Sequence, residues 1–405
     1  MRLITGLCQG CFDILHAGHI RHLRAAKARV DRLVVAVTVD EYVNKGPGRP
    51  INTLKDRMDV LEALEMVDKV VPSYSESAVD VINCVQPDLY IKGAEYRDKP
   101  DPSGRIDLER EAVVALGGNL IFTDEETDSS TRIVNATKLE TQLDLIRGLK
   151  VALYGDWIMD GTGGKVMKPG HMMLDLGEVV YDWGGVMAFS RHAMGLGCRT
   201  RVETSLPVIK KIRLPDGSRI DILPDVLEER IEQYGEAFTD PQLTIVADFG
   251  HTTSPISASS WPLILRSKFI AWNAQANTAN QRDLHSYWLN QGLEPSLITM
   301  NEREWISCKG YIPQAEHVVV TKKNGATLIG GNSIEFDTDL PVVDTTGCGD
   351  AFCTAIACAM AVGVDVYEAM RFGCLAGLAT TQWALNKETI CPQRLIETTK
   401  HIKFK

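Results

Sequence analysis

Two histidines near the start of the chain, His16 and His19, close the run GCFDILHAGH, which begins at Gly10. Three residues apart, their imidazoles share one face of a helix. There they can donate hydrogen bonds to phosphates and stabilise the charge that develops as an α-phosphoryl group is attacked and pyrophosphate leaves. Gly10 and Gly18 would allow a phosphate to approach the backbone at the helix start. Solvated or core histidines are the alternative for this spacing alone.

A second run, DTTGCGDAF from Asp344 to Phe352, combines an anion-binding loop with a carboxylate. The loop Gly347, Cys348, Gly349 opens a helix and offers backbone amides to an anion. Asp350 follows at once, where it could take a proton from a substrate hydroxyl that attacks a γ-phosphate. The run therefore predicts a phosphoryl-transfer site in the second half of the chain.

The elements that must position these residues alternate along the chain, as in parallel βαβ units. Helical patterns separate the expected strands, and ligands in such sheets bind at the carboxyl edge. We expect an α/β protein with two domains: a Rossmann-like, doubly wound parallel sheet over residues 1–148, including a linking helix, and a second α/β domain over residues 149–405. The five strands expected in the first domain are Leu3–Cys8, Arg32–Thr38, Lys69–Tyr74, Asp88–Gly93 and Asn119–Asp124.

Composition narrows the class of function. The chain has 405 residues and a formal charge of −10, which argues against a nucleic-acid-coating surface but leaves small anionic substrates in play. We find no apolar run of about eighteen residues and no signal peptide, so we expect a cytoplasmic protein without a membrane partner. Ten scattered cysteines fit free thiols in a reducing compartment. Cys8 and Cys11 form a lone CxxC, for which a buried position at a strand end is favoured over zinc or redox chemistry.

The first 135 residues resemble the adenylyltransferase domain of bifunctional ADP-heptose synthesis enzymes, within the cytidylyltransferase-like superfamily. After GCFDILHAGH come KGPGRPINTLKDRMDVLEALEMVD, PDLYIKGAEY and DSSTRIV, in the order seen in that domain. The resemblance implies that His16 and His19 act on the triphosphate. We expect Asp13 to hold the turn rather than act chemically, and a solvated basic loop is the alternative for Lys45 and Arg49. The other residues implied to bind nucleotide or phosphate are Gly10, Phe12, Lys45, Arg49, Lys92, Ser129, Ser130 and Thr131.

Most of residues 149–385 resemble the ribokinase family of carbohydrate kinases. DTTGCGDAF is similar to the family's DTxGAGDxF signature, with Cys348 in place of alanine. YGDWIMD and GGVMAFSRHAMGLG resemble its first strand and its glycine-pair helix start, which implies sugar binding by Asp160, Gly184 and Gly185. A turn or cap residue is the alternative for Asp160. The resemblance implies nucleotide or anion binding by Gly347, Cys348 and Gly349, by Thr321 and Gly325, and by the NxxE pair Asn301 and Glu304, with Glu304 acting indirectly on magnesium.

Two departures from the kinase pattern put its sugar contacts in doubt. Ala188 stands where the family has a sugar-binding asparagine, and VADFGHTTSP, residues 246–255, replaces a DYGKG-like segment. Asp350 argues against an inactive kinase, although a non-catalytic ligand-binding or regulatory module is the alternative from another class.

Together the resemblances point to bifunctional heptose kinase/adenylyltransferase enzymes with the domain order reversed. We expect transfer of AMP from ATP to a heptose-like sugar 1-phosphate for a cell-surface polysaccharide, sugar phosphorylation with ATP, and Mg²⁺ in both sites. A CTP-dependent enzyme acting on a polyol or sugar phosphate is the rival. The partners expected are a sugar phosphate and a nucleoside triphosphate, without nucleic acid, and the family leaves a homo-oligomer open.

Overall fold

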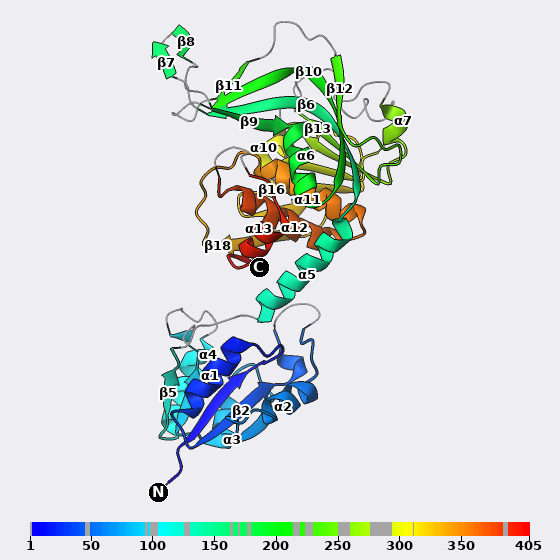
Figure 1. The fold of residues 1–405 in the computed structure, drawn as a ribbon. Coiled ribbons are helices and arrows are strands. Elements are labelled where there is room, and N and C mark those ends of the chain that lie inside the picture. The colour runs from blue at the N-terminus through cyan, green and yellow to red at the C-terminus, as the bar shows by residue number, and fades with distance from the viewer. Residues whose placement is uncertain are drawn as a thin grey trace. The chain divides into compact units, whose positions relative to one another are not determined.

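The computed structural model divides into two compact units, residues 1–135 and 136–405. It describes residues 2–44, 49–93, 96–97, 104–124, 130–162, 165–168, 171–175, 180–213, 219–222, 230–249, 260–275, 294–310, 312–383 and 388–405. Figure 1 shows the elements of each unit along the chain. None of the helices in these ranges is long and apolar enough to cross a membrane.

The first unit is a five-stranded parallel sheet with strand order β3-β2-β1-β4-β5. Its inner strand β2 reads RLVVAVT and is buried from its second residue onward, as expected for a parallel strand covered on both faces. The five strands are β1 (Thr5–Gly10), β2 (Arg32–Thr38), β3 (Lys69–Ser73), β4 (Leu89–Lys92) and β5 (Asn119–Phe122).

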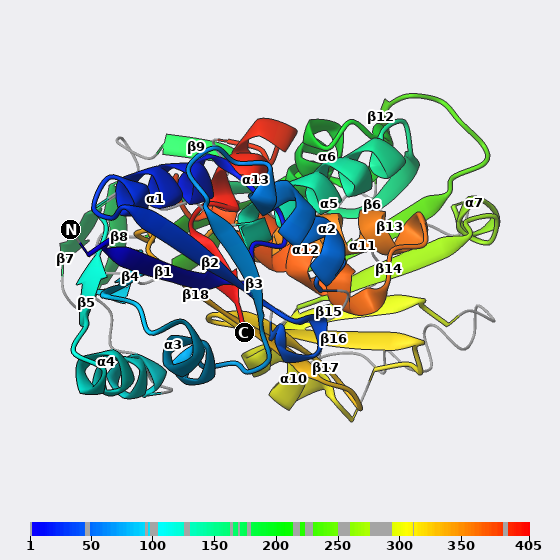
Figure 2. The ribbon, with the colours of Figure 1, turned by 90° about the horizontal axis from the view of Figure 1, so that it is seen from below.

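Helices cover both faces of this sheet (Figure 2). Leu23 of α1 and Leu61 of α2 pack on one face, whereas Val81 of α3 and Val113 of α4 pack on the other. This is the doubly wound arrangement that the sequence predicts. The helices are α1 (Ala17–Lys27), the 3-10 helix η1 (Asp40–Tyr42), α2 (Leu54–Glu62), α3 (Val79–Val85) and α4 (Arg105–Ala115).

The second unit is built on a twelve-stranded sheet whose middle, β10-β6-β13-β14-β15-β16, is parallel. Antiparallel strands flank this region: β11, β12 and β9 pair with β10 or β6, and β17, β18 and β19 extend the far edge, while β7 and β8 form a separate pair. The strands are β6 (Lys150–Thr162), β7 (Lys165–Lys168), β8 (His171–Asp175), β9 (Val180–Gly185), β10 (Arg199–Arg213), β11 (Arg219–Ile222), β12 (Arg230–Gly235), β13 (Leu243–Asp248), β14 (Phe269–Ala274), β15 (Leu297–Asn301), β16 (His317–Lys322), β17 (Gly325–Leu328), β18 (Ser333–Thr338) and β19 (Ile402–Phe404).

Two hydrophobic clusters lie on opposite faces of the second sheet. The larger packs one face against α5, α6, α11, α12 and α13, and the smaller packs the other face against α7. Helix α11 is buried from Asp350 to Ala359, so most of its length packs in the core. The helices are α5 (Ser130–Ile146), α6 (Val186–Gly195), α7 (Trp261–Ile264), α10 (Glu302–Cys308), α11 (Cys348–Ala361), α12 (Val366–Thr380) and α13 (Pro392–Thr398).

The two units divide earlier than the boundary expected near Gly148. Leu139, Leu143 and Ile146 of α5 are buried in the large cluster of the second unit, beside Leu149 and Val151. The linking helix assigned to the first domain therefore contributes its apolar face to the core of the second.

Candidate functional sites

Polar side chains mark the carboxyl edge of the first sheet. Thr38, Ser73 and Lys92 end strands β2, β3 and β4, and Thr123 directly follows β5. All four are buried. Gln9, near the end of β1, donates from Nε2 to Thr38 Oγ1 at 3.0 Å. Because ligands of open α/β sheets bind at the carboxyl ends of the strands, this edge is the candidate ligand site of the first unit.

The turn from β1 to α1 brings the two predicted histidines together. His16 is the extended residue that precedes α1, and its ring stacks on that of His19 with centroids 3.8 Å apart. The Phe12 ring lies 5.1 Å from that of His19. Phe12 is buried and has φ +47°, a conformation that costs a non-glycine residue free energy. A Cβ at Gly10 would lie 3.1 Å from the Phe12 ring, so Gly10 lets that ring pack against the turn.

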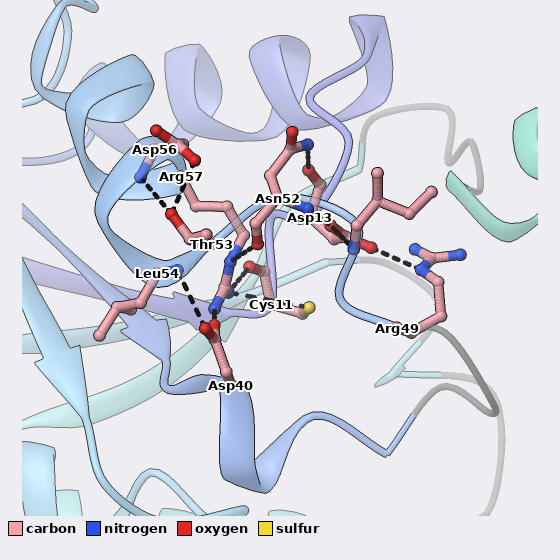
Figure 3. A network of polar contacts seen from close by, with 10 residues as sticks. Cys11, Asp13, Asp40, Arg49, Asn52, Thr53, Leu54, Asp56 and Arg57 are labelled. Atoms are coloured by element: carbon pink, nitrogen blue, oxygen red, sulfur yellow. Dashed lines mark hydrogen bonds and ion pairs between the residues drawn. The ribbon is translucent and has the colours of Figure 1, made fainter.

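Asp13 fastens this turn to the loop that precedes α2 (Figure 3). Its carboxylate accepts hydrogen bonds from the backbone amides of Ile51 and Asn52, at 2.7 and 3.0 Å. It also forms an ion pair with Arg49 Nε. Burial alone would raise the pKa of Asp13, but the Asn52 amide, Arg49 and the Ile51 amide outweigh it, so the pKa lies below its ordinary value. The expectation that Asp13 holds the turn agrees with these contacts.

Arg49 is buried rather than solvated, its side chain being 6% exposed. Its Nε pairs with Asp13, and its Nη2 is buried without a hydrogen-bond partner among the residues described. A buried guanidinium N–H without a partner is costly, and an anion at this point would satisfy it. Lys45, the other basic residue predicted here, lies outside the described residues.

Arg57 is a site residue that the sequence reading missed. Its side chain is fully buried and donates to the carbonyl oxygens of Cys11 and Asn52, and it forms an ion pair with Asp40 (Figure 3). It thus ties α2 to the same β1–α1 turn from a second side. The signal was present, because Arg57 occupies an inward-facing position of α2 between Leu54 and Leu61, where an apolar residue is normal.

Lys92, predicted at the nucleotide, lies at the carboxyl edge. Its Nζ is 3.2 Å from Glu109 Oε2 and 3.5 Å from Gln9 Oε1, and it sits 4.9 Å from the centroid of the Tyr96 ring. Burial, with the Lys92 charge as a second cause, lowers the pKa of His22 to about 4. A neutral His22 fits its contact with the hydroxyl of Thr123, from Nδ1 to Oγ1 at 2.9 Å.

The remaining predictions for the first unit are decided only in part. Ser129 lies outside the described residues, and Ser130 and Thr131 form the first turn of α5, with side chains that the structure does not describe. Cys8 is buried, which raises its pKa to about 12, and Cys11 is half-buried. The described residues hold no group of three or more histidine, cysteine or acidic side chains that could bind a metal ion. Cys8 lies buried within β1, and the expectation against zinc or redox chemistry stays a prediction.

In the second unit, β9 brings the glycine pair against the end of β6. Gly184 pairs with Ile158, which lies two residues before Asp160 on β6. A Cβ at Gly184 would collide with Asp160 Oδ2, and one at Gly185 would collide with the backbone oxygen of Asp156. Gly185, at φ +61°, immediately precedes α6. The structure thus places Asp160, Gly184 and Gly185 together, and their binding of a sugar stays a prediction, while Ala188 is buried in α6.

The loop predicted to bind an anion leads into α11. Gly347 precedes the helix with φ +76°, Gly349 is exposed, and Asp350 is buried in the first turn. The backbone amide and hydroxyl of Thr346 both donate to Asp344 Oδ1 at 2.9 Å, which fixes the entry to the loop. Burial and the neighbouring Asp350 raise the pKa of Cys348 to about 11, so its thiol stays protonated near neutral pH.

Asn301 and Glu304 form a helix capping box at the start of α10. Asn301 Oδ1 accepts from the Glu304 amide at 2.9 Å, and Glu304 Oε2 accepts from the Asn301 amide at 2.7 Å. Thr321 pairs with Asn301 across β15 and β16. Gly325 passes close to the backbone of Ile334, where a Cβ would collide. Asn301 and Glu304 therefore stabilise the start of α10, and Gly325 allows a close approach of two strands. Residues 250–255 of the altered segment lie outside the described residues.

With this geometry in place, comparison with known families defines the class of each unit. Residues 7–136 match the cytidylyltransferase-like family, and residues 252–385 match the pfkB family of carbohydrate kinases. The chain thus matches a nucleotidyltransferase family over its first unit and a carbohydrate kinase family over part of its second, in the order that the sequence predicts. Both domains are α/β, as predicted.

The relatives found are similar over the first unit. The bifunctional protein HldE of Vibrio cholerae serotype O1 (strain M66-2) is 42% identical over 135 residues, and that of Chromohalobacter salexigens is 44% identical over 138. These alignments cover 33% and 34% of this chain but 27% and 28% of the relatives, so the chain matches about a quarter of their length. The crystal structure of a Methanocaldococcus jannaschii nucleoside kinase covers 63% of this chain and 99% of its own, at 12% identity and a TM-score of 0.43.

Proposed function

We propose that this protein makes a nucleotide sugar. The first unit would transfer AMP from ATP to a heptose-like sugar 1-phosphate with release of pyrophosphate, and the second would phosphorylate a sugar with ATP. The observation that carries the proposal is the stacked pair His16 and His19 at the carboxyl edge, in a domain 42% identical to a bifunctional HldE protein. Cytoplasmic location and lipopolysaccharide synthesis belong to the same proposal.

In the first unit, His16 and His19 would donate hydrogen bonds to the triphosphate as the sugar phosphate attacks the α-phosphorus. Lys92 and the buried Nη2 of Arg49 would neutralise the phosphates. The restraints on the β1–α1 turn from Asp13 and Arg57 would keep both imidazoles in place without a cost of ordering at each turnover.

In the second unit, Asp350 would accept the proton of the sugar hydroxyl that attacks the γ-phosphate. Asp160 and the glycine pair would hold the sugar, and the amides of Gly347 to Gly349 would face the transferred phosphoryl group. Mg²⁺, when bound with ATP, supplies charge neutralisation at the phosphate oxygens. Glu304 would act on it indirectly, since one carboxylate oxygen is committed to the Asn301 amide.

CTP is the alternative nucleotide, because the matched family is named for cytidylyl transfer. A non-catalytic second unit is the alternative from another class, because Ala188 replaces the expected asparagine and Asn301 serves as a helix cap. One assay separates these. The full chain is incubated with Mg²⁺, ATP or CTP, and a panel of sugars and sugar phosphates, while pyrophosphate and nucleoside diphosphate are measured separately.

The expected result is pyrophosphate with ATP and a sugar 1-phosphate, lost in H19A, and ADP with a free sugar or sugar phosphate, lost in D350N. Each variant should keep the activity of the other unit. Pyrophosphate with CTP alone would favour the rival nucleotide. Absence of ADP with every sugar, together with retained ligand binding, would favour a regulatory second unit. If neither product forms with any substrate, the proposal fails.

A further inference from the structure

Lys92 is a charged group that the fold has taken out of water. Its side chain is 9% exposed, at the end of β4 on the carboxyl edge. Burying an ammonium group is costly unless opposite charge and acceptors replace its hydration. The three N–H donors of Lys92 have an acceptor in Glu109 at 3.2 Å and another in Gln9 at 3.5 Å. Among the residues that the structure describes these two are its hydrogen-bonding acceptors, so an anion at this edge could use the third donor.

Glu109 supplies the compensating charge from another element. It lies on α4, beside α3 in Figure 2, and its side chain is 3% exposed. Its Oε2 accepts from the Tyr90 hydroxyl at 2.9 Å and faces Lys92 at 3.2 Å, while its Oε1 accepts from the Ala78 amide at 2.8 Å. Burial and the Glu109 charge raise the pKa of Tyr90 well above its ordinary value, so that hydroxyl keeps its proton and donates it.

These contacts fix the position of the carboxylate rather than merely neutralise a charge. Tyr90 belongs to the same strand as Lys92, and Ala78 immediately precedes α3, so Glu109 is held by two elements besides its own. A carboxylate with both oxygens engaged has little freedom to move. The ammonium group that pairs with it is consequently held at one place on the edge.

We propose that Glu109 is the positioning residue that sets Lys92 to receive the phosphates of the nucleotide. This inference rests on the proposed nucleotidyl transfer. Glu109 itself touches no substrate. Its charge lets Lys92 remain at the carboxyl edge without bound ligand, and the Tyr90 hydroxyl fixes the carboxylate oxygen that faces the ammonium group. Motif spacing does not single out Glu109, because it follows the PDLYIKG run and belongs to none of the runs that carry the resemblance.

The test is a double-mutant cycle on the full chain, with E109Q, K92M and the double variant. E109Q keeps the side-chain volume but removes the charge and one acceptor, so Lys92 loses its partner. We expect E109Q to raise the KM for ATP by about tenfold, the size of one charge-assisted hydrogen bond, with a smaller change in kcat. In the K92M background the same substitution should change KM less than about twofold, because its target is gone.

E111Q is the matched control, since Glu111 is an exposed carboxylate on the same helix, and it should leave both constants unchanged. Thermal unfolding of each variant reports folding separately. If E109Q does not fold, E109D replaces it, because it keeps the charge and withdraws it by one methylene group. An equal effect of the substitution in both backgrounds would overturn the proposal, since Glu109 would then act through general stability.

Binding of inorganic tripolyphosphate, measured by calorimetry, makes the result independent of turnover. E109Q should weaken that binding when Lys92 is present and leave it unchanged in the K92M background. If the wild type binds tripolyphosphate in this way but releases no pyrophosphate from any substrate, the proposed nucleotidyl transfer fails and the role of Glu109 stands. If E109Q releases pyrophosphate with unaltered constants, the role of Glu109 fails and the proposed nucleotidyl transfer stands.

Discussion

The surroundings of Asp13 favour its charged carboxylate. The same contacts restrain the turn that carries His16 and His19. Two backbone amides and Arg49 face it from a segment 36 to 39 residues further along the chain. Its pKa is therefore lower in the folded protein than in the unfolded chain, where the ordinary value of 3.8 applies. A lowered pKa means that this group stabilises the fold above the unfolded pKa and that the contribution is lost as the pH falls through the folded value.

D13N should consequently destabilise the first unit by about 3 kcal/mol near neutral pH, because it leaves the buried Arg49 without its counter-charge. The difference from the wild type should begin to shrink as the pH falls below 3.8, where the carboxylate of the unfolded chain becomes protonated, and should be lost once the pH falls below the lowered pKa of the folded protein. Urea unfolding followed by circular dichroism at several pH values measures this difference.

The chain offers two controls for D13N. D107N removes an exposed carboxylate of the same unit and should cost little. All seven tryptophans lie between Trp157 and Trp383, so tryptophan fluorescence reports only the second unit and should show no change in D13N. A destabilisation of D13N that is the same at every pH would contradict the electrostatic explanation.

At this scale the sequence predicts residues that belong to local motifs and misses those whose partners are distant. His16, His19 and Asp13 share one run of ten residues, so spacing alone indicates their proximity. Arg57 donates to the carbonyl of Cys11, 46 residues earlier, and Glu109 reaches Tyr90 from another helix. Such pairings depend on which helix packs beside which strand, and a single sequence contains no direct measure of that.

At the scale of elements, alternation and burial predict the first sheet closely. The strand Arg32–Thr38 has the expected bounds, because a run of β-branched residues buried on both faces has few alternatives. The first strand, expected at Leu3–Cys8, is Thr5–Gly10 instead. Its pairing with β2, in which Gly10 faces Val37, extends the strand to Gly10, the first residue of the GCFDILHAGH run.

Helix α10 provides a prediction at this scale, because its first turn depends on two side chains implied to bind nucleotide or magnesium. N301A should destabilise the second unit by about 1 kcal/mol, since it leaves the Glu304 amide without its cap. N301D should restore most of that stability, because aspartate caps as well as asparagine does. Urea unfolding followed by tryptophan fluorescence measures both, since Trp305 lies in the helix itself.

The same two variants separate capping from ligand binding. If Asn301 acts only as a cap, N301D should have the wild-type dependence of ADP formation on Mg²⁺ concentration. A shift of that dependence in N301D, with stability intact, would show that the amide group contacts the nucleotide or the ion as well.

At the scale of the whole molecule, the order of the two domains could be predicted and their boundary could not. Helical periodicity continues through α5, so the sequence suggests a linker that ends near Gly148. Only packing reveals that Leu139, Leu143 and Ile146 share a core with Phe189 of α6. The apolar positions of an isolated helix do not show which neighbouring domain will bury them.

The boundary has a consequence that can be measured on fragments of the second unit. A fragment of residues 136–405 keeps the three buried side chains of α5, whereas residues 149–405 lack them. Burial of a leucine or isoleucine stabilises a fold by about 2 kcal/mol, so the shorter fragment should be less stable by on the order of 5 kcal/mol. Both fragments contain all seven tryptophans, and fluorescence during urea unfolding compares them directly.

Substitutions in the intact chain test the same packing without truncation. Leu143 is 5% exposed and Leu145, on the same helix, is 54% exposed. L143A should destabilise the second unit by about 3 kcal/mol through the lost burial and the cavity left behind. L145A should change it by less than about 0.5 kcal/mol, since little of that side chain is withdrawn from water. Equal stability of L143A and L145A, or of the two fragments, would place α5 outside the core of the second unit and return the boundary to Gly148.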